Sequence, residues 1–484
     1  MSGCGASKAV KERRPMSISS EGGAALPAVD FARTVREGPF GRRQGIIIFM
    51  LGLLVLLDGM DTQMLGVIAH DITRDLGLPI SSFGVVFASG LAGAIIGAMV
   101  MSPMGDRWLG RKTITILSMA LASLSTIVTP LATNLNELLL IRIIAGIGLG
   151  AAMPGVFSLL MEFSPTRYTR PITSCLVAFM PLGSFLGGMI GQAVVPDFGW
   201  RMLLYVGGGL TLAVTLVAMV LLPESVYFLL NIKKDTARAL SVARRFLPHM
   251  AIGSLVPDER HVAARQNQPV AKLFAGGFWK FTLLIWLAYI LNQGIVYFVL
   301  SWTPALLESS GAAQSSGMHA ASMFGLGGAL GTALQGWMAA RFNIYRLMFI
   351  EMAVYVIGIL ILPSILADEL FAPVAVFFIS AGICAYHAGF IIILSETYPD
   401  DFRTTGFGWA LGIGRFGATL APVLAGTMVG LGWGAQHIFS AAAIPGVASA
   451  LTLFGIAILL GAKGRRTRTA AAVMPAGDPL TSTR

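Results

Sequence analysis

The sequence predicts an all-α membrane protein in which twelve transmembrane helices form two six-helix halves that repeat in parallel, with both termini in the cytoplasm. Three observations predict this fold class. First, 55% of the 484 residues are hydrophobic and 12% are charged, about half the charged share of a soluble domain. Second, the apolar residues gather in runs long enough to cross a bilayer as helices. Third, short motifs of the first half recur in the second half at a nearly constant spacing.

Each predicted helix is a mostly apolar run of about 20 residues, the length that spans the hydrocarbon core of a bilayer. The runs cover 45–69, 81–104, 113–133, 136–161, 171–194, 201–222, 278–304, 317–340, 344–365, 371–394, 405–430 and 437–461. The predicted organisation is an N-terminal tail (1–44), an N-terminal half (45–222), a polar central loop (223–277), a C-terminal half (278–461) and a C-terminal tail (462–484).

Basic residues decide the predicted orientation, because Lys and Arg collect in the cytoplasmic loops of membrane proteins. Of the 34 Lys and Arg residues, only Arg74 and Arg201 fall in loops on the opposite side, and Arg142 and Arg415 lie within apolar runs. The other Lys and Arg residues lie in the two tails, in the central loop, and in loops or helix ends on the same side of the membrane as the central loop. The net charge of +10 therefore follows from topology, and we expect membrane lipids but no nucleic acid as partners.

The two halves carry matching motifs. Glu162-Phe-Ser-Pro165 recurs as Glu396-Thr-Tyr-Pro399, and Gly199-Trp200 recurs as Gly432-Trp433. Because each half has an even number of predicted spans, both halves enter the membrane in the same orientation. Parallel repeats of this kind occur in transporters that bind substrate near the midplane between the halves.

Two carboxylates lie inside the first apolar run, at Asp58 and Asp61. A charged carboxylate near the bilayer centre is costly, so these residues are candidates for a functional site. Their spacing puts both on one face of a helix, where they could face a shared cavity. We predict that Asp58 and Asp61 bind the coupling proton and that Arg142, at a similar depth, modulates them. A structural ion pair is the alternative for these residues.

Substrate-binding candidates lie in the second half. Arg415 is predicted near mid-membrane among glycines, and a guanidinium can hold a carboxylate through two hydrogen bonds. Pairing with Glu351 is the structural alternative for Arg415. The other candidates can donate or accept hydrogen bonds or stack on an aromatic ring, and they are His387, Asn292, Gln293 and Trp409.

The turn after the second run reads Met104-Gly-Asp106-Arg107-Trp-Leu-Gly110-Arg111-Lys112. Its glycines allow close backbone approach, and Asp106 can interact with the positive N-terminal end of a neighbouring helix. Arg107, Arg111 and Lys112 could also contact anionic lipid or acidic groups. Gly105 and Gly110 have the spacing of a phosphate-binding loop, but Arg111 stands where that motif needs Lys.

This turn resembles the signature turn of the major facilitator superfamily. Arg142-x-x-x-Gly146-x-Gly148, Glu162-x-x-Pro165 and Pro223-Glu224-Ser225 agree with the resemblance, which covers about 42–460. The resemblance implies a gating role for Gly105, Asp106, Arg107, Gly110, Arg111, Lys112, Glu162, Glu396 and Arg403. The second copy of the turn is degenerate, with Ala340 in place of the acid, and we interpret this as gating by one half only.

Within that superfamily the sequence is most similar to aromatic acid:proton symporters. The resemblance rests on Asp58-Gly-Met-Asp61-Thr, Ser301-Trp302-Thr-Pro304 and the long segment from Tyr398 to Gly417. It implies proton-driven uptake of benzoate-like, hydroxybenzoate-like or phenylpropionate-like anions by a monomer in the inner membrane of a bacterium.

Two other functions remain open from the residues alone. The protein could carry aliphatic acids of the muconate or shikimate kind, or it could be a transporter-like sensor that binds its ligand without moving it. The sequence contains no nucleophile–base pair, metal-ligand cluster or phosphate loop, so we predict neither an enzyme nor a cofactor, with the proton as coupling ion. Three widely spaced cysteines predict neither a disulfide framework nor a metal site.

Overall fold

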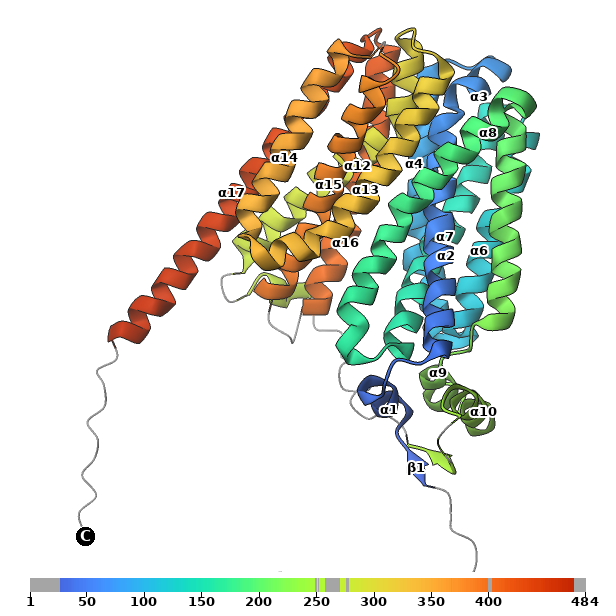
Figure 1. Ribbon diagram of the computed structural model, residues 1–484, viewed down its shortest axis with the longest axis vertical. Helices are drawn as coiled ribbons and strands as arrows, with labels where there is room; N and C mark the ends of the chain where they lie inside the picture. The colour runs from blue at the N-terminus through green and yellow to red at the C-terminus, as the bar shows by residue number, and fades with distance from the viewer. Residues whose placement is uncertain are drawn as a thin grey trace, which may run out of the picture.

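A computed structural model describes residues 27–473 apart from 249, 251, 257–269, 276–277, 367 and 399–402. Within these residues the chain is a helical bundle with two halves side by side (Figure 1). The N-terminal half contains α2 (Arg42–Val67), α4 (Phe83–Ile96), α6 (Arg111–Val128), α7 (Leu135–Phe163) and α8 (Thr166–Leu221). The C-terminal half contains α12 (Trp279–Ser309), α13 (Gln314–Arg341), α14 (Ile344–Ile361), α15 (Phe371–Thr397), α16 (Arg403–Gly430) and α17 (Ala435–Val473).

Ten helices of the described chain are long and apolar enough to cross a membrane. One of them, α8, has 56 residues and is interrupted at Gly199, whose φ of 77° is not helical, so it covers two of the predicted runs. The run predicted at 317–340 falls in α13, which is not among the ten. The helical architecture is therefore as expected, and the number of twelve spans stays a prediction.

The helices approach one another closely because small residues lie at their crossings. A Cβ atom on Gly183 of α8 would overlap the carbonyl oxygen of Leu56 of α2. A Cβ on Gly325 of α13 would overlap the backbone at Phe185 of α8, so the same packing joins the two halves. These contacts fix α2 and α13 on either side of α8.

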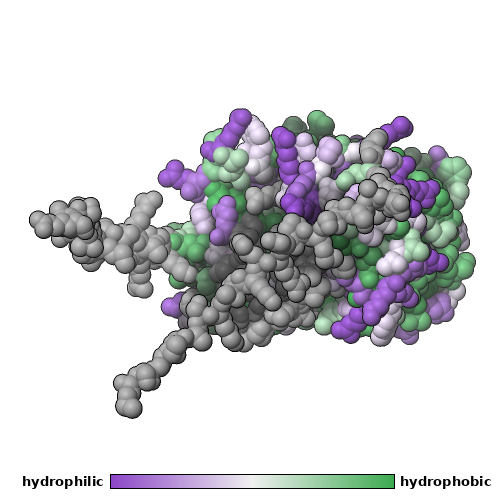
Figure 2. Space-filling model, turned by 90° about the horizontal axis from the view of Figure 1, so that it is seen from below, coloured by the Kyte–Doolittle hydropathy of each residue, from purple (hydrophilic) through white to green (hydrophobic). Residues whose placement is uncertain are grey.

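Short elements lie at one end of the bundle, which we call the loop end (Figure 1). Here β1 (Ala28–Val29) pairs in parallel with β2 (Ser254–Leu255), and α9 (Val226–Asn231) and α10 (Thr236–Phe246) follow the last helix of the N-terminal half. Figure 2 shows this face, where hydrophilic side chains lie around the rim and hydrophobic ones cover the flanks of the bundle.

Part of the segment predicted as an N-terminal tail is folded. Helix α1 (Phe31–Glu37) begins after Asp30, whose side chain accepts a hydrogen bond from the backbone of Arg33 and caps the helix. Phe31 packs edge-to-face against Phe163 of α7 and Phe246 of α10. The residues from Ala28 to Glu37 thus join the central loop to the N-terminal half.

The halves are bridged by hydrogen bonds toward the opposite end, which we call the far end. The Gln314 amide of α13 donates to Asp71 of α3 (Ala69–Asp75) over 2.7 Å. Gln192 of α8 donates to Ser322 of α13 over 2.8 Å, and Gln63 of α2 donates to the Leu300 carbonyl over 3.4 Å. Burial raises the pKa of the Asp71 carboxyl, while the Gln314 amide, His70 and Arg74 oppose that rise.

Candidate functional site

Asp61 belongs to a buried charge pair inside the N-terminal half. Its carboxylate lies 3.4 Å from the Arg142 guanidinium of α7 and accepts a 2.5 Å hydrogen bond from the Thr126 hydroxyl of α6. Arg142 also donates to the Thr129 hydroxyl over 3.0 Å. The side chains of Asp61 and Arg142 are 9% and 3% exposed, so both charged groups are buried. The ion pair and the two hydroxyl groups compensate for the water that the charged groups have lost.

Asp58 faces a different environment, although it lies one helical turn from Asp61. It is buried, and its carboxylate has no hydrogen bond or ion pair among the described residues. Arg415 of α16 and Tyr297 of α12 lie within electrostatic range of it, both in the C-terminal half. The two acids were expected to face a shared cavity, but their surroundings differ. Asp61 has partners in its own half, and Asp58 faces the other half.

Arg415 is partly buried and has no hydrogen bond from its guanidinium among the described residues. Its predicted structural partner, Glu351, instead contacts Gln335. Tyr297 lies within electrostatic range of both Arg415 and Asp58. A cation without a fixed anionic partner, facing a carboxylate across the interface between halves, can accept a carboxylate ligand.

His387 of α15 and Asn292 of α12 form one unit. His387 Nδ1 lies 2.8 Å from Asn292 Oδ1, and the Asn292 amide donates to the Ile383 carbonyl over 3.4 Å. Because an amide oxygen can only accept, Nδ1 carries the hydrogen, and Nε2 of a neutral ring is left as an acceptor. Tyr289 covers the imidazole edge-to-face at 5.5 Å between ring centres.

The remaining candidates differ in position. Gln293 lies against Gly414, where a Cβ would come within 3.1 Å of its Cγ atom. Trp409 is 44% exposed and stacks on Trp286, with 5.8 Å between ring centres. Trp302 is fully buried and donates to the Pro422 carbonyl over 3.1 Å, so it packs α12 on α16.

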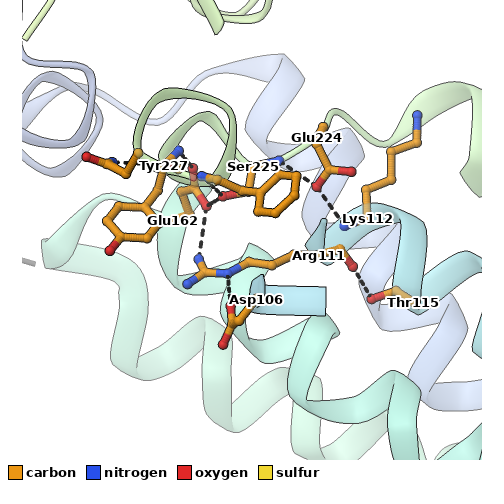
Figure 3. Close-up of polar contacts among 10 residues, drawn as sticks. Asp106, Arg111, Lys112, Thr115, Glu162, Glu224, Ser225 and Tyr227 are labelled. Atoms are coloured by element: carbon orange, nitrogen blue, oxygen red, sulfur yellow. Dashed lines mark hydrogen bonds and ion pairs between the residues drawn. The ribbon is translucent and has the colours of Figure 1, made fainter. Parts of the chain in front are cut away.

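The predicted gating turn is held by a polar network at the loop end of the N-terminal half (Figure 3). Arg111 donates to Asp106 over 3.0 Å and to Glu162 of α7 over 3.1 Å. Glu162 also accepts from the Ser225 hydroxyl over 2.6 Å and from the backbone of Tyr227 over 3.0 Å. Arg111 is therefore bound to acids of the protein itself, and Arg107 is the exposed cation of the turn.

Glu224 occupies the N-terminal end of α6. Its carboxylate accepts hydrogen bonds from the backbone of Lys112 and Thr113, the first turn of α6, and from the Thr113 hydroxyl (Figure 3). Gly110 has a φ of 101°, and a Cβ there would lie 2.5 Å from the same carboxylate. Gly110 thus provides both the backbone turn and the space for Glu224, while Gly105 is packed against Ile114.

Fewer contacts are described at the corresponding turn of the second half. Glu396 is exposed and lies within electrostatic range of Tyr345, and Arg341 lies over the Trp337 ring at 4.2 Å. The side chain of Arg403 lies outside the described residues. The gating roles assigned to these residues stay predictions.

Sequence reasoning missed several partners of the site. It did not find Thr126, Tyr289 or the pairing of Gln335 with Glu351, and it gave Glu224 no role of its own. A serine, threonine or amide within an apolar run is a weak signal, because such residues often bond to their own helix. The Glu of Pro223-Glu224-Ser225 was available as a signal, since it directly follows a predicted span.

Two helical halves side by side, with Asp58 of one half within electrostatic range of Arg415 of the other, are typical of a membrane transporter. The family model of the Major Facilitator Superfamily matches residues 51–383 and 285–479, and the chain belongs to this superfamily.

Curated relatives cover almost the whole chain. It is 32% identical to the 4-hydroxybenzoate transporter of Acinetobacter baylyi, over 88% of this chain and 94% of the relative. It is also 32% identical to the gallate transporter of Pseudomonas putida, over 92% and 98%. The resemblance stated from the sequence motifs is thereby confirmed.

A solved structure has the same fold. The xylose transporter of E. coli, in a partially occluded inward-open conformation, superposes with a TM-score of 0.67 and 17% identity, over 86% of this chain and 98% of that one.

Proposed function

We propose that this protein takes up small aromatic carboxylates together with protons by alternating access. The observation that carries the proposal is Arg415, a cation whose guanidinium has no hydrogen bond among the described residues and that faces Asp58 across the two halves. The curated relatives named 4-hydroxybenzoate, gallate and benzoate transporters support an aromatic acid as substrate.

Carboxylate recognition follows from the chemistry of this pair. A substrate carboxylate at Arg415 would form charge-assisted hydrogen bonds with the guanidinium. Its negative charge would offset the positive charge of Arg415 that otherwise favours ionised Asp58. Two negative charges would then face each other, which favours proton binding at Asp58. Substrate binding and proton binding would thus promote one another, as symport requires.

The aromatic part of the substrate has polar and aromatic neighbours in the same half. The imidazole of His387 offers Nε2 to a ring hydroxyl, since Asn292 fixes the hydrogen on Nδ1. Gln293 and Trp409 are the further substrate-binding candidates. Muconate-like or shikimate-like acids, and ligand sensing without transport, are the alternatives that the tests below would reveal.

Topology and location belong to the same proposal. We infer twelve spans with both termini and the loop end in the cytoplasm, because Lys and Arg gather on that side. The protein would be a monomer in a bacterial inner membrane and need no cofactor besides the proton. The loop-end network around Arg111 and Glu162 would fix the gating turn against the rest of the N-terminal half. The same network would rearrange during gating.

The test is substrate accumulation in proteoliposomes with radiolabelled benzoate, 4-hydroxybenzoate, gallate and muconate. An inward proton gradient without a membrane potential should drive accumulation, and an uncoupler should abolish it. One proton per monoanion is electroneutral, whereas two would add a drive of about 2.3 kcal/mol per 100 mV of inside-negative potential. Binding without accumulation under either force would indicate a sensor, and preference for muconate would indicate the aliphatic alternative.

A further inference from the structure

A buried acid of the C-terminal half has one polar partner among the described residues. Glu351 of α14 is 6% exposed, and its Oε2 atom accepts a 3.4 Å hydrogen bond from the Gln335 amide of α13. Gln335 is 0% exposed. Its amide lies against α15, where a Cβ on Gly389 would come within 3.0 Å of Nε2. The pair is therefore closed in by three helices.

The other two oxygen atoms of this pair have no partner. Glu351 Oε1 and Gln335 Oε1 are both buried, and neither forms a hydrogen bond in the described structure. Two acceptors cannot bond to each other. A carboxylic acid and a primary amide, however, complement each other fully: the amide N–H donates to one carboxyl oxygen, and the acid O–H donates to the amide oxygen. One proton on Glu351 would satisfy both orphaned atoms.

Charge leads to the same conclusion. An ionised carboxylate inside a membrane helix is expensive unless a cation or several donors compensate it. No Lys, Arg or His lies within ion-pair distance of Glu351 among the described residues. A neutral acid costs far less to bury.

The neighbouring titratable groups do not supply the missing donor. Tyr386 of α15 gives its hydroxyl to the Ser449 carbonyl of α17 over 3.0 Å. Tyr355, on the helix of Glu351, gives its hydroxyl to the Ala442 carbonyl over 2.7 Å. On α14 the nearest cation in sequence, Arg346, is exposed, and Tyr345 lies near Glu396 at the loop end. Tyr386 lies within electrostatic range of Glu351, but among the described residues the hydrogen bond to the Glu351 carboxyl group comes from Gln335.

We propose that Glu351 is a proton-binding site of the C-terminal half, holding one proton that its carboxyl group donates to Gln335. The site is separate from Asp58 and Asp61, which lie on α2 of the other half. The proton would come from water. The inference does not depend on which substrate the protein carries.

The test uses the purified full chain in lipid nanodiscs and infrared difference spectroscopy across a pH titration. The parent protein should show the C=O stretching band of a protonated, buried carboxyl group near neutral pH. This band should be lost in Glu351→Gln and kept in the matched control Glu369→Gln, which replaces an exposed acid. Persistence of the whole band in Glu351→Gln, or its absence from the parent, would overturn the proposal.

Thermal unfolding gives an independent readout. A Gln at 351 can donate to Gln335 Oε1 and accept from Nε2, so Glu351→Gln keeps both hydrogen bonds without a titrating proton. It should unfold at the parent's temperature in acid, and its stability should no longer fall as the pH rises. Gln335→Leu removes both bonds and should lower the unfolding temperature at every pH. If Glu351→Gln is as unstable as Gln335→Leu in acid, a glutamine does not reproduce the two hydrogen bonds of the protonated pair and the proposal is wrong.

Discussion

At the scale of single residues, the two acids of α2 have different partners. Asp61 contacts Arg142 and Thr126, both within its own half. Asp58 lies within electrostatic range of Arg415, which belongs to the other half and, under the proposed alternating access, would move relative to α2. Under this proposal the electrostatic surroundings of Asp58 would change with conformation, whereas those of Asp61 would not.

This difference predicts distinct effects of neutral substitutions. Asp58→Asn keeps the shape but cannot bind a proton, so accumulation against a gradient should be lost while exchange of labelled for unlabelled substrate persists. Asp61→Asn leaves Arg142 buried without its anion, which should also lower the unfolding temperature. Uptake, exchange and unfolding in proteoliposomes check these outcomes.

Asp235→Asn is the matched control, because Asp235 is the N-cap of α10 and Asn caps a helix equally well. It should behave as the parent in all three assays. If both α2 variants accumulate substrate like the parent, the acids are structural.

Arg415 predicts the recognition of the carboxylate group. Arg415→Lys keeps the charge but loses the planar pair of donors, which should weaken acid binding by about 2 kcal/mol, roughly 30-fold. The amide analogue of the best substrate should bind the parent and the variant equally poorly. Equal weakening of acid and amide would instead show that Arg415 shapes the cavity.

The sequence predicted these residues for one physical reason, the cost of a charge in a bilayer. The same rule marked Asp58, Asp61, Arg142 and Arg415 without any structure. Their partners were not predictable, because Thr126 is 65 residues from Asp61 and Gln335 approaches Glu351 only through the crossing of α13 and α14. Neutral polar residues in apolar runs carry no comparable penalty and so give no comparable signal.

At the scale of elements, the sequence predicted the long helices well because length and apolar content determine them. It did not predict α1 or β1, which are short and polar and depend on contacts with α10 and β2. The turn between α4 and α6 was recognised as a unit. The contact of this turn with Glu224 was not predicted, because Glu224 follows the last helix of the half and is far from the turn in sequence.

Gly110 provides the test of that turn. Gly110→Ala would place a Cβ at positive φ and against the Glu224 carboxylate, which should cost about 2–4 kcal/mol of stability. Gly77 is the matched control: its φ is 64° and a Cβ there meets no atom within 4 Å, so Gly77→Ala should cost about 1–2 kcal/mol. Unfolding of both variants in detergent measures the difference, and equal losses would mean that Glu224 readily moves aside.

At the scale of the whole molecule, the halves are similar in path but unequal in their contacts. The network of Arg111, Glu162 and Glu224 stabilises the N-terminal half at the loop end, and the second half has Ala340 where the first has Asp106. The hydrogen bonds described between the halves lie toward the far end. Such an arrangement would let the halves separate first at the loop end, and the far-end contacts would have to break for the opposite opening.

A cross-link at the far end tests this directly. A Cβ on Gly430 of α16 would lie 3.4 Å from Cβ of Ser81, in the short helical turn Ile80–Ser82, close to the separation of about 3.5–4.5 Å found in disulfides. Ser81→Cys combined with Gly430→Cys should therefore form a disulfide under mild oxidation and hold the halves together. Uptake and exchange should both stop, and a reducing agent should restore them, because alternating access needs this end to open.

Each single variant under the same oxidation is the control and should transport as before. If the cross-linked protein still exchanges substrate at the reduced rate, the far end need not open, and the alternating-access part of the proposal fails.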